Sequence, residues 1–295
     1  MKSRTLKILF FVLLIGFTSW AQDSDFDEFE NLSEDSSSGE KKQKNDDDSP
    51  EQSTDSTFTE PSTISKNVPS EDLAKFKQMM GTKNESAIIE AAARILGRNP
   101  DHLETLNALG VYYFQTKKFG LAKIFFKRAL NQNKEEPAIY NNLGIVYLAE
   151  GDLKLAIDSF KKSLAARSGY SVGATNLSSI YLKYLDYKRS ISPLEDAYRS
   201  IRSDLRRGTN DSVEIANNYA VALMGINEND KARKIFEEIS SAGVRNPVPY
   251  LNQAILLVEV LKKKSDALRV LSKLKFMTND STVLRKVAEL EKKLE

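Results

Sequence analysis

The sequence predicts an all-α fold, an α-solenoid of helix hairpins, because one apolar pattern recurs at a constant spacing of 34 residues. The first copy has Leu109, Gly110, Tyr113, Ala122, Phe126 and Ala129, and the second has Leu143, Gly144, Tyr147, Ala156, Phe160 and Ser163. Spacings of three and four place each half of the pattern on one face of a helix. A repeat of this length is typical of stacked helix–turn–helix units, and the small Gly110 and Ala122 predict a close approach of the two helices.

The composition limits the chemistry that the chain can perform. Its 295 residues are 41% hydrophobic, which is enough for one solenoid, and they include no cysteine and one histidine, His102. The missing cysteines exclude disulfides, zinc–thiolate sites and thiol catalysis. The net charge of +2 is unevenly distributed, since residues 22–60 carry −11 and residues 61–295 carry +10.

Residues 1–21 have the pattern of a secretory signal peptide. Three basic residues, Lys2, Arg4 and Lys7, precede an apolar stretch over residues 6–17 that is short for a membrane span. Small residues at Ser19 and Ala21 predict cleavage after Ala21, and an uncleaved anchor is the alternative. We therefore expect export, with the bacterial periplasm as the favoured location, a secreted or signal-anchored protein as alternatives, and no stable membrane span after cleavage.

Residues 22–68 form an acidic leader that we expect to be disordered, because it offers few apolar groups to offset the entropy of ordering a chain. Within the leader, Phe26, Phe29 and Leu32 recur every third residue among acidic neighbours. This motif is either part of a solvated tail or a short docking helix for a partner or for the basic domain that follows. An intramolecular contact of the leader is therefore one of the predicted partnerships.

The solenoid is predicted to occupy residues 69–295. A degenerate opening pair near 70–98 precedes repeats at 103–136, 137–170, 171–208, 213–246 and 247–278, and a capping helix at 281–294 closes the array. Eight additional residues separate the third and fourth repeats and are expected to lengthen a helix by about two turns. Pro193 is expected to make that helix begin late or kink, and one additional residue is expected in the turn of the fifth repeat.

The lengthened helix is predicted to end as a protruding basic spur. Four arginines make up this spur: Arg199, Arg202, Arg206 and Arg207. The spur is either a solvated helix face or a docking site for an anionic partner.

The recurring residues resemble the tetratricopeptide repeat (TPR) family. The resemblance covers roughly residues 70–278 and rests on four features. They are the small residue after leucine in the first helix, the Ala–large–Ala face of the second helix, the Gly151-Asp152 turn and the junction at 99–101. It implies a right-handed α-solenoid of about five TPR hairpins, with a degenerate N-terminal pair, a C-terminal capping helix and a concave groove lined by the first helices. Members of the family usually bind peptides or partner proteins and carry no chemistry of their own.

Asparagines recur on the predicted first helices and are the candidate groove residues: Asn107, Asn141, Asn142, Asn176, Asn217, Asn218 and Asn252. A carboxamide has both a donor and an acceptor, so such a ladder could pair with the backbone of an extended peptide. The alternative is that the amides bridge neighbouring helices. One branch of the family grips carboxylates with basic residues, but Asn107, Val172 and Asn176 occupy those positions here, which disfavours that mode.

Taken together, the sequence predicts a non-enzymatic protein–protein interaction scaffold of the bacterial cell envelope, binding a peptide or helix of a complex subunit in the groove. No glycine-rich phosphate loop, nucleophile elbow or spaced metal ligands occur, so no catalytic residue, metal or cofactor is expected. Asp101 is expected to cap a helix, and nucleic acid is not an expected partner. A periplasmic chaperone or carrier for extended clients and a basic adaptor for anionic envelope polymers are the alternatives.

Overall fold

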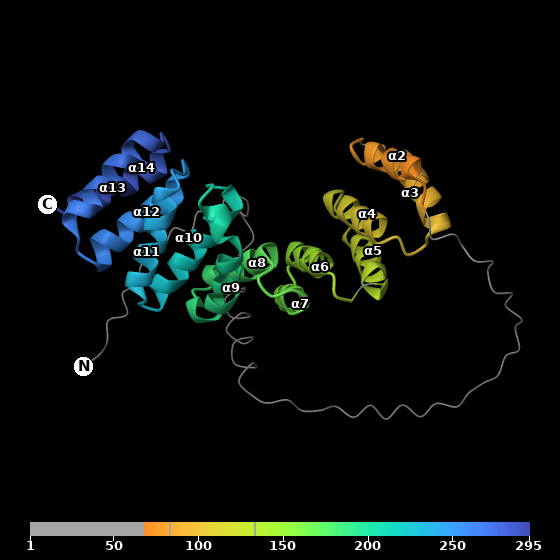
Figure 1. Ribbon diagram of the computed structural model, residues 1–295, viewed down its shortest axis with the longest axis horizontal. Helices are drawn as coiled ribbons and strands as arrows, with labels where there is room; N and C mark the ends of the chain where they lie inside the picture. Colours follow the sequence, from red (N-terminus) through yellow and green to blue (C-terminus); the bar gives the residue numbers. More distant parts are fainter. Residues whose placement is uncertain (1–67, 83, 133) are drawn as a thin grey trace, which may run out of the picture. The chain divides into compact units, whose positions relative to one another are not determined.

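The computed structural model describes residues 68–295 except 83 and 133, and the regular elements of that part of the chain are all helical (Figure 1). This confirms the predicted all-α class. The predictions for the signal peptide, the leader and the motif of Phe26, Phe29 and Leu32 lie outside the described residues. None of the described helices has the length and apolar character that crossing a membrane requires.

The described residues divide into two compact units, 68–156 and 157–295, here called the N-terminal and C-terminal units. The N-terminal unit contains α2 (Ser70–Met80), α3 (Glu85–Arg98), α4 (Leu103–Gln115), α5 (Phe119–Gln132) and α6 (Pro137–Glu150), and α7 (Leu153–Ala166) spans the boundary. The C-terminal unit continues with α8 (Ser171–Lys183), α9 (Tyr187–Leu205), α10 (Asn210–Gly225), α11 (Asn229–Ser241), α12 (Pro247–Ile255), the π-helix η2 (Leu256–Val260), α13 (Lys264–Met277) and α14 (Ser281–Lys292).

Gly110 sets the distance between α4 and α5. A Cβ atom at this position would lie 2.5–2.8 Å from three ring atoms of Phe126, closer than side-chain carbons approach one another. Phe126 and Ala129 are buried at the same crossing. The predicted close approach of the two helices is therefore present, and the glycine is what permits it.

In the five repeats from α4 onward, the turn between the first and the second helix contains one residue in the left-handed region. That residue is Gly151 after α6, with φ of 84°, and its counterparts are Lys117, Leu185, Asn227 and Lys262, with φ between 54° and 65°. The turn geometry is thus kept in every repeat although glycine supplies it in one of these five. The strain of a non-glycine residue at positive φ is accepted because the two flanking helices are fixed by their packing.

The predicted late start of the helix that contains Pro193 is wrong. Helix α9 begins at Tyr187, six residues before the proline, because Asp186 caps it by accepting a hydrogen bond from the backbone N–H of Arg189. Ser190 Oγ also donates to the backbone oxygen of Tyr187, which stabilises the first turn. The alternative expectation, a kink at Pro193, stays a prediction.

The eight additional residues are shared between two helices. Helix α9 has 19 residues, against 14 in α5 and α7, and α10 has 16, against 13 in α8. The expected protrusion of the helix end is wrong, because the last residue, Leu205, is only 1% exposed. The lengthened helix packs along α10, Arg202 pairs with Glu238 of α11, and Arg207 pairs with Asp204 near the end of α9.

The sequence analysis placed the additional residue of the fifth repeat in the turn, and this prediction is wrong. The residue lies inside the first helix of that repeat. Helix α12 continues as the π-helix η2, a geometry that accommodates one extra residue. Spacing supports this: Ala254 stands eight residues before the left-handed Lys262, whereas Gly110 stands seven before Lys117. Helix α14 then packs on α12 and α13 and buries Val283, Val287 and Leu290, with Asp280 as its N-cap.

Candidate functional site

The half-exposed side of α4 and α6 is the surface of the N-terminal unit that a partner could contact. We call it the α4–α6 face and define it by Asn107, Ala108, Val111 and Phe114 of α4 and Asn142, Ile145, Leu148 and Ala149 of α6. These residues are all partly buried, whereas the opposite side of α4 is buried against α5. The face is largely apolar apart from its two asparagines, and the Phe114 ring packs against Phe119 with centroids 5.8 Å apart.

A hydrogen bond between two asparagines joins the neighbouring first helices at this face. Asn142 Nδ2 donates to Asn107 Oδ1 over 2.9 Å. Because each amide has two N–H groups and one oxygen, the bond leaves Asn107 Nδ2 and Asn142 Oδ1 without a hydrogen bond among the described residues. The α4–α6 face therefore retains one amide donor group and one amide acceptor for a ligand.

The same bridge occurs in the C-terminal unit. Asn252 Nδ2 of α12 donates to Asn217 Oδ1 of α10 over 2.9 Å, and Asn217 Nδ2 donates to Asn218 Oδ1 over 3.3 Å. Both bridges join asparagines that are 35 residues apart. Amide bridging between helices, the alternative interpretation of the asparagine pattern, therefore describes these two pairs.

The seven candidate asparagines differ in their access to a partner. Four of them are at most 7% exposed and belong to the interior of the fold in this structure: Asn141, Asn217, Asn218 and Asn252. Asn107, Asn142 and Asn176 are half-buried. A direct role of these three in binding stays a prediction.

The four arginines of the predicted spur are exposed, and three of them are ion-paired. Arg199 pairs with Glu195 and Asp196, Arg202 pairs with Glu238 of α11, and Arg207 pairs with Asp204. Arg206 is the member with no ion pair within the part of the chain that the structure describes. The spur is therefore largely neutralised by its own neighbours, and binding of an anionic partner there stays a prediction.

Glu238 connects the lengthened helix to α11. Its carboxylate accepts a hydrogen bond from the Tyr198 hydroxyl at 2.5 Å and one from Arg202 Nη2 at 2.9 Å. Burial, together with the hydrogen bond to Glu238, raises the pKa of Tyr198 well above its usual range. The Tyr198 ring also packs against Tyr219 of α10, so this cluster fixes α9 to two helices and is structural.

The single histidine has a structural role. His102 is the N-cap of α4, and its Nδ1 accepts a hydrogen bond from the Thr105 backbone N–H at 3.3 Å. The expectation that Asp101 caps this helix is wrong, because the residue at the cap position is its neighbour. Among the described residues no three metal-ligating side chains gather in a cluster.

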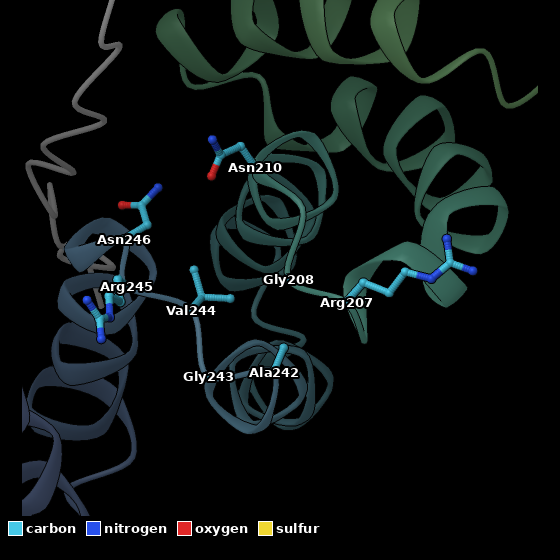
Figure 2. A pocket seen from close by; sticks show the side chains of 8 residues that line it. All are labelled: Arg207, Gly208, Asn210, Ala242, Gly243, Val244, Arg245 and Asn246. Carbon is cyan, nitrogen blue, oxygen red and sulfur yellow. The ribbon is translucent and has the colours of Figure 1, made fainter.

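A surface cavity of about 550 Å³ lies in the C-terminal unit, where the turn after α9 meets the turn before α12 (Figure 2). Its lining consists of Arg207, Gly208, Asn210, Ala242, Gly243, Val244, Arg245 and Asn246. Figure 2 shows the side chains of Arg207 and Arg245 extending to opposite sides, so they do not converge on one ligand position. Asn246 Oδ1 already accepts from the Val248 N–H as a helix cap. The cavity therefore lacks a convergent set of binding groups.

Known proteins resemble this chain in its repeats and its fold. A family model described as tetratricopeptide repeat matches residues 103–136, and a second with the same description matches residues 122–171. The crystal structure of YrrB, a TPR protein with an unusual peptide-binding site, superposes with a TM-score of 0.55 at 17% identity, covering 68% of this chain and 98% of that chain. A structure of Pseudomonas aeruginosa pilF gives a TM-score of 0.56 at 17% identity, covering 74% and 96%. No curated protein sequence matches significantly.

Proposed function

Because the chain is a tetratricopeptide repeat protein, whose stacked hairpins form a protein–protein interaction scaffold, we propose that it binds a segment of a partner protein on the α4–α6 face. The occupant is a peptide or helix that presents its backbone or a polar side chain to the asparagines. Apolar side chains of the same segment pack against Val111 and Ile145. The family is typically non-enzymatic, and the proposed role is to hold an assembly together without catalysing a reaction.

This proposal rests on the two amide groups of the Asn107–Asn142 pair that make no hydrogen bond within the described residues. Asn107 Nδ2 can donate to a peptide carbonyl, and Asn142 Oδ1 can accept from a peptide N–H. Both atoms are held in place by the bridge itself, so little side-chain entropy is lost when a ligand binds. The amides contact the backbone irrespective of sequence, while the apolar residues select for an amphipathic segment.

The comparison with YrrB supports a peptide ligand. YrrB is described as having a peptide-binding site, and its fold matches most of this chain. At 17% identity the likeness concerns the fold, so the residues that would bind here come from the α4–α6 face and not from the relative.

The proposed place of action is the bacterial cell envelope, after export. Residues 1–21 support it, through their basic start, their apolar centre and the small residues before the expected cleavage point at Ala21. An envelope assembly subunit is accordingly the class of partner that we propose.

A charged residue on the α4–α6 face tests the proposal. Val111→Lys places an ammonium group in the middle of the apolar strip, and its long stem can still cover the helix surface. The matched control is Ile124→Lys, because Ile124 is 60% exposed on the outer side of α5. Tagged wild-type protein and both variants are isolated from the envelope fraction of native cells, and bound proteins and the mature N-terminus are identified by mass spectrometry.

We expect one stoichiometric partner with the wild type and with Ile124→Lys, a loss of about tenfold or more with Val111→Lys, and a mature chain that begins at Gln22. Equal capture by all three proteins would exclude the α4–α6 face as the binding site. Many weakly bound clients in place of one partner would favour the chaperone function. Circular dichroism on each variant verifies that the helical fold is retained.

A further inference from the structure

Helix α13 presents an aromatic ring entirely to solvent. Phe276 is 94% exposed, while the apolar residues on the inner side of the same helix, such as Leu271 and Leu274, are fully buried. Leu268 is 40% exposed and lies two helical turns before Phe276, with the exposed Ser272 between them. Spacings of four residues place all three on one side of the helix, so they form a short apolar strip that the fold does not use.

Basic residues border this strip. We call the surface the α13 outer face and define it by Lys264, Leu268, Arg269, Ser272, Lys275 and Phe276. On a helix with 100° per residue, Lys264 and Lys275 fall on one side of the strip and Arg269 on the other. The arrangement is an apolar strip between two lines of positive charge.

Two of the three basic residues of this face are ion-paired, and the unpaired positive charge comes from Lys264 on the face and from the turn that precedes it. Lys275 pairs with Glu291 at 2.7 Å, Arg269 pairs with Asp266 at 3.1 Å, and the Lys264 ammonium contacts a backbone oxygen near the C-terminus. The Arg269–Asp266 pair is exposed, and exposed ion pairs contribute little free energy, so a second acidic partner can compete for Arg269. Lys262 and Lys263, in the turn before α13, are exposed and have no ion pair within residues 68–295 as described.

We propose that the α13 outer face is the docking site of the chain's own acidic leader, through the segment of residues 25–32. That segment has Phe26, Phe29 and Leu32 at intervals of three, and acidic residues at 25, 27, 28 and 30 surround them. The leader therefore carries the same arrangement as the α13 outer face, an apolar series bordered by charge, with the sign reversed. Complementary charge fixes the register, and contact between the aromatic rings removes Phe276 from water.

The leader and the α13 outer face belong to the same chain, so a weak contact between them is sufficient. Leu32 lies 37 positions before Pro69, the N-cap residue of α2, and an extended chain of that length spans about 120 Å. Covalent attachment gives an effective local concentration on the order of millimolar, so a contact with a dissociation constant in that range is substantially occupied. While the leader is bound, another protein can bind the α13 outer face only if its own acidic, aromatic segment displaces the leader.

Introduced cysteine pairs test the docking in the full chain, because the protein has no cysteine of its own. Ser33→Cys places a thiol directly after the leader motif, and Ser272→Cys places one between Leu268 and Phe276. The control pair combines Ser33→Cys with Ser203→Cys, since Ser203 is also exposed and lies in the same unit. Each protein is oxidised at high dilution, and intrachain and interchain disulfides are separated by gel and assigned by peptide mass.

We expect the 33–272 pair to form an intrachain disulfide about tenfold faster than the 33–203 pair, and Phe276→Ser to reduce that rate to the control value. High salt should also slow the reaction, because it screens the charges. Equal rates for the two pairs would overturn the proposal, as would products that join two chains, which would indicate docking onto a second copy. The assay needs no partner protein, so its result is independent of the α4–α6 face.

Discussion

Neighbouring first helices are tied together by single amide–amide hydrogen bonds, at Asn142–Asn107 and at Asn252–Asn217. The two bridges have the same length, 2.9 Å, and different surroundings, since Asn252 is 3% exposed and Asn142 is half-buried. The cost of losing a bridge therefore depends on whether water can replace the missing partner. This difference separates a structural asparagine from one that is free to serve a ligand.

Removal of Asn252 is expected to be the more damaging of the two changes. Asn252→Ala leaves the buried Asn217 oxygen without a donor and should lower the free energy of unfolding by about 1–3 kcal/mol. Asn142→Ala leaves a half-exposed oxygen that water can reach, and the expected loss is about 0.5–1.5 kcal/mol. Urea denaturation followed by circular dichroism measures both values. A larger loss for Asn142→Ala would contradict this account of the two bridges.

At the scale of the helices, the constant period predicted where most of them lie, because the apolar face of each hairpin must meet its neighbours at the same positions. Irregular features left weaker signals. The turn after α6 contains Gly151 and is readable, whereas Leu185 takes the same left-handed conformation without any sequence signal. The π-helix adds one residue to the interval between the small helix residue and the left-handed turn residue, which is eight from Ala254 to Lys262 and seven from Gly110 to Lys117. The sequence does not reveal this difference, because Lys117 and Lys262 are recognised as equivalent only by their backbone conformation.

The candidate site was only partly predictable from the sequence. The asparagines stood out by their recurrence, but whether an amide is buried in the fold or lies on a half-exposed face depends on a shift of one residue, from Asn141 to Asn142, which a helical pattern does not resolve. The exposure of Phe276 was hidden for a similar reason, because an apolar residue within an amphipathic helix is ordinarily assigned to the core. Both assignments needed the positions of the neighbouring helices.

Replacement of two prolines in the C-terminal unit by alanine is expected to change the free energy of unfolding in different directions. Pro193 lies inside α9, where it removes the hydrogen bond to the carbonyl four residues earlier, so Pro193→Ala should raise the free energy of unfolding by about 1–3 kcal/mol. Pro247 is the first residue of α12, where its missing N–H has no helical partner, so Pro247→Ala should be neutral or slightly destabilising. Thermal unfolding of the two variants compares them directly. A destabilised Pro193→Ala protein would show that the ring packs usefully against its neighbours.

At the scale of the whole molecule, a solenoid distributes its stability over contacts between adjacent repeats, so a defect should remain local. Gly110→Ala tests this because the new methyl group would meet the ring of Phe126 at 2.5–2.8 Å, which should cost about 1–3 kcal/mol in the N-terminal unit. Gly97→Ala is the matched control, since its Cβ would have no heavy atom within 4 Å, and alanine favours the helix.

Hydrogen exchange read by mass spectrometry resolves the effect along the chain. With Gly110→Ala we expect faster exchange in α3, α4 and α5, which pack around the altered crossing, and unchanged exchange in α10 to α13. Gly97→Ala should leave all of these segments unchanged or slightly slower. Faster exchange throughout both units would mean that residues 68–295 unfold as one cooperative body. The nearest-neighbour description of the stability would then fail, because a methyl group at one crossing would have destabilised helices that share no contact with it.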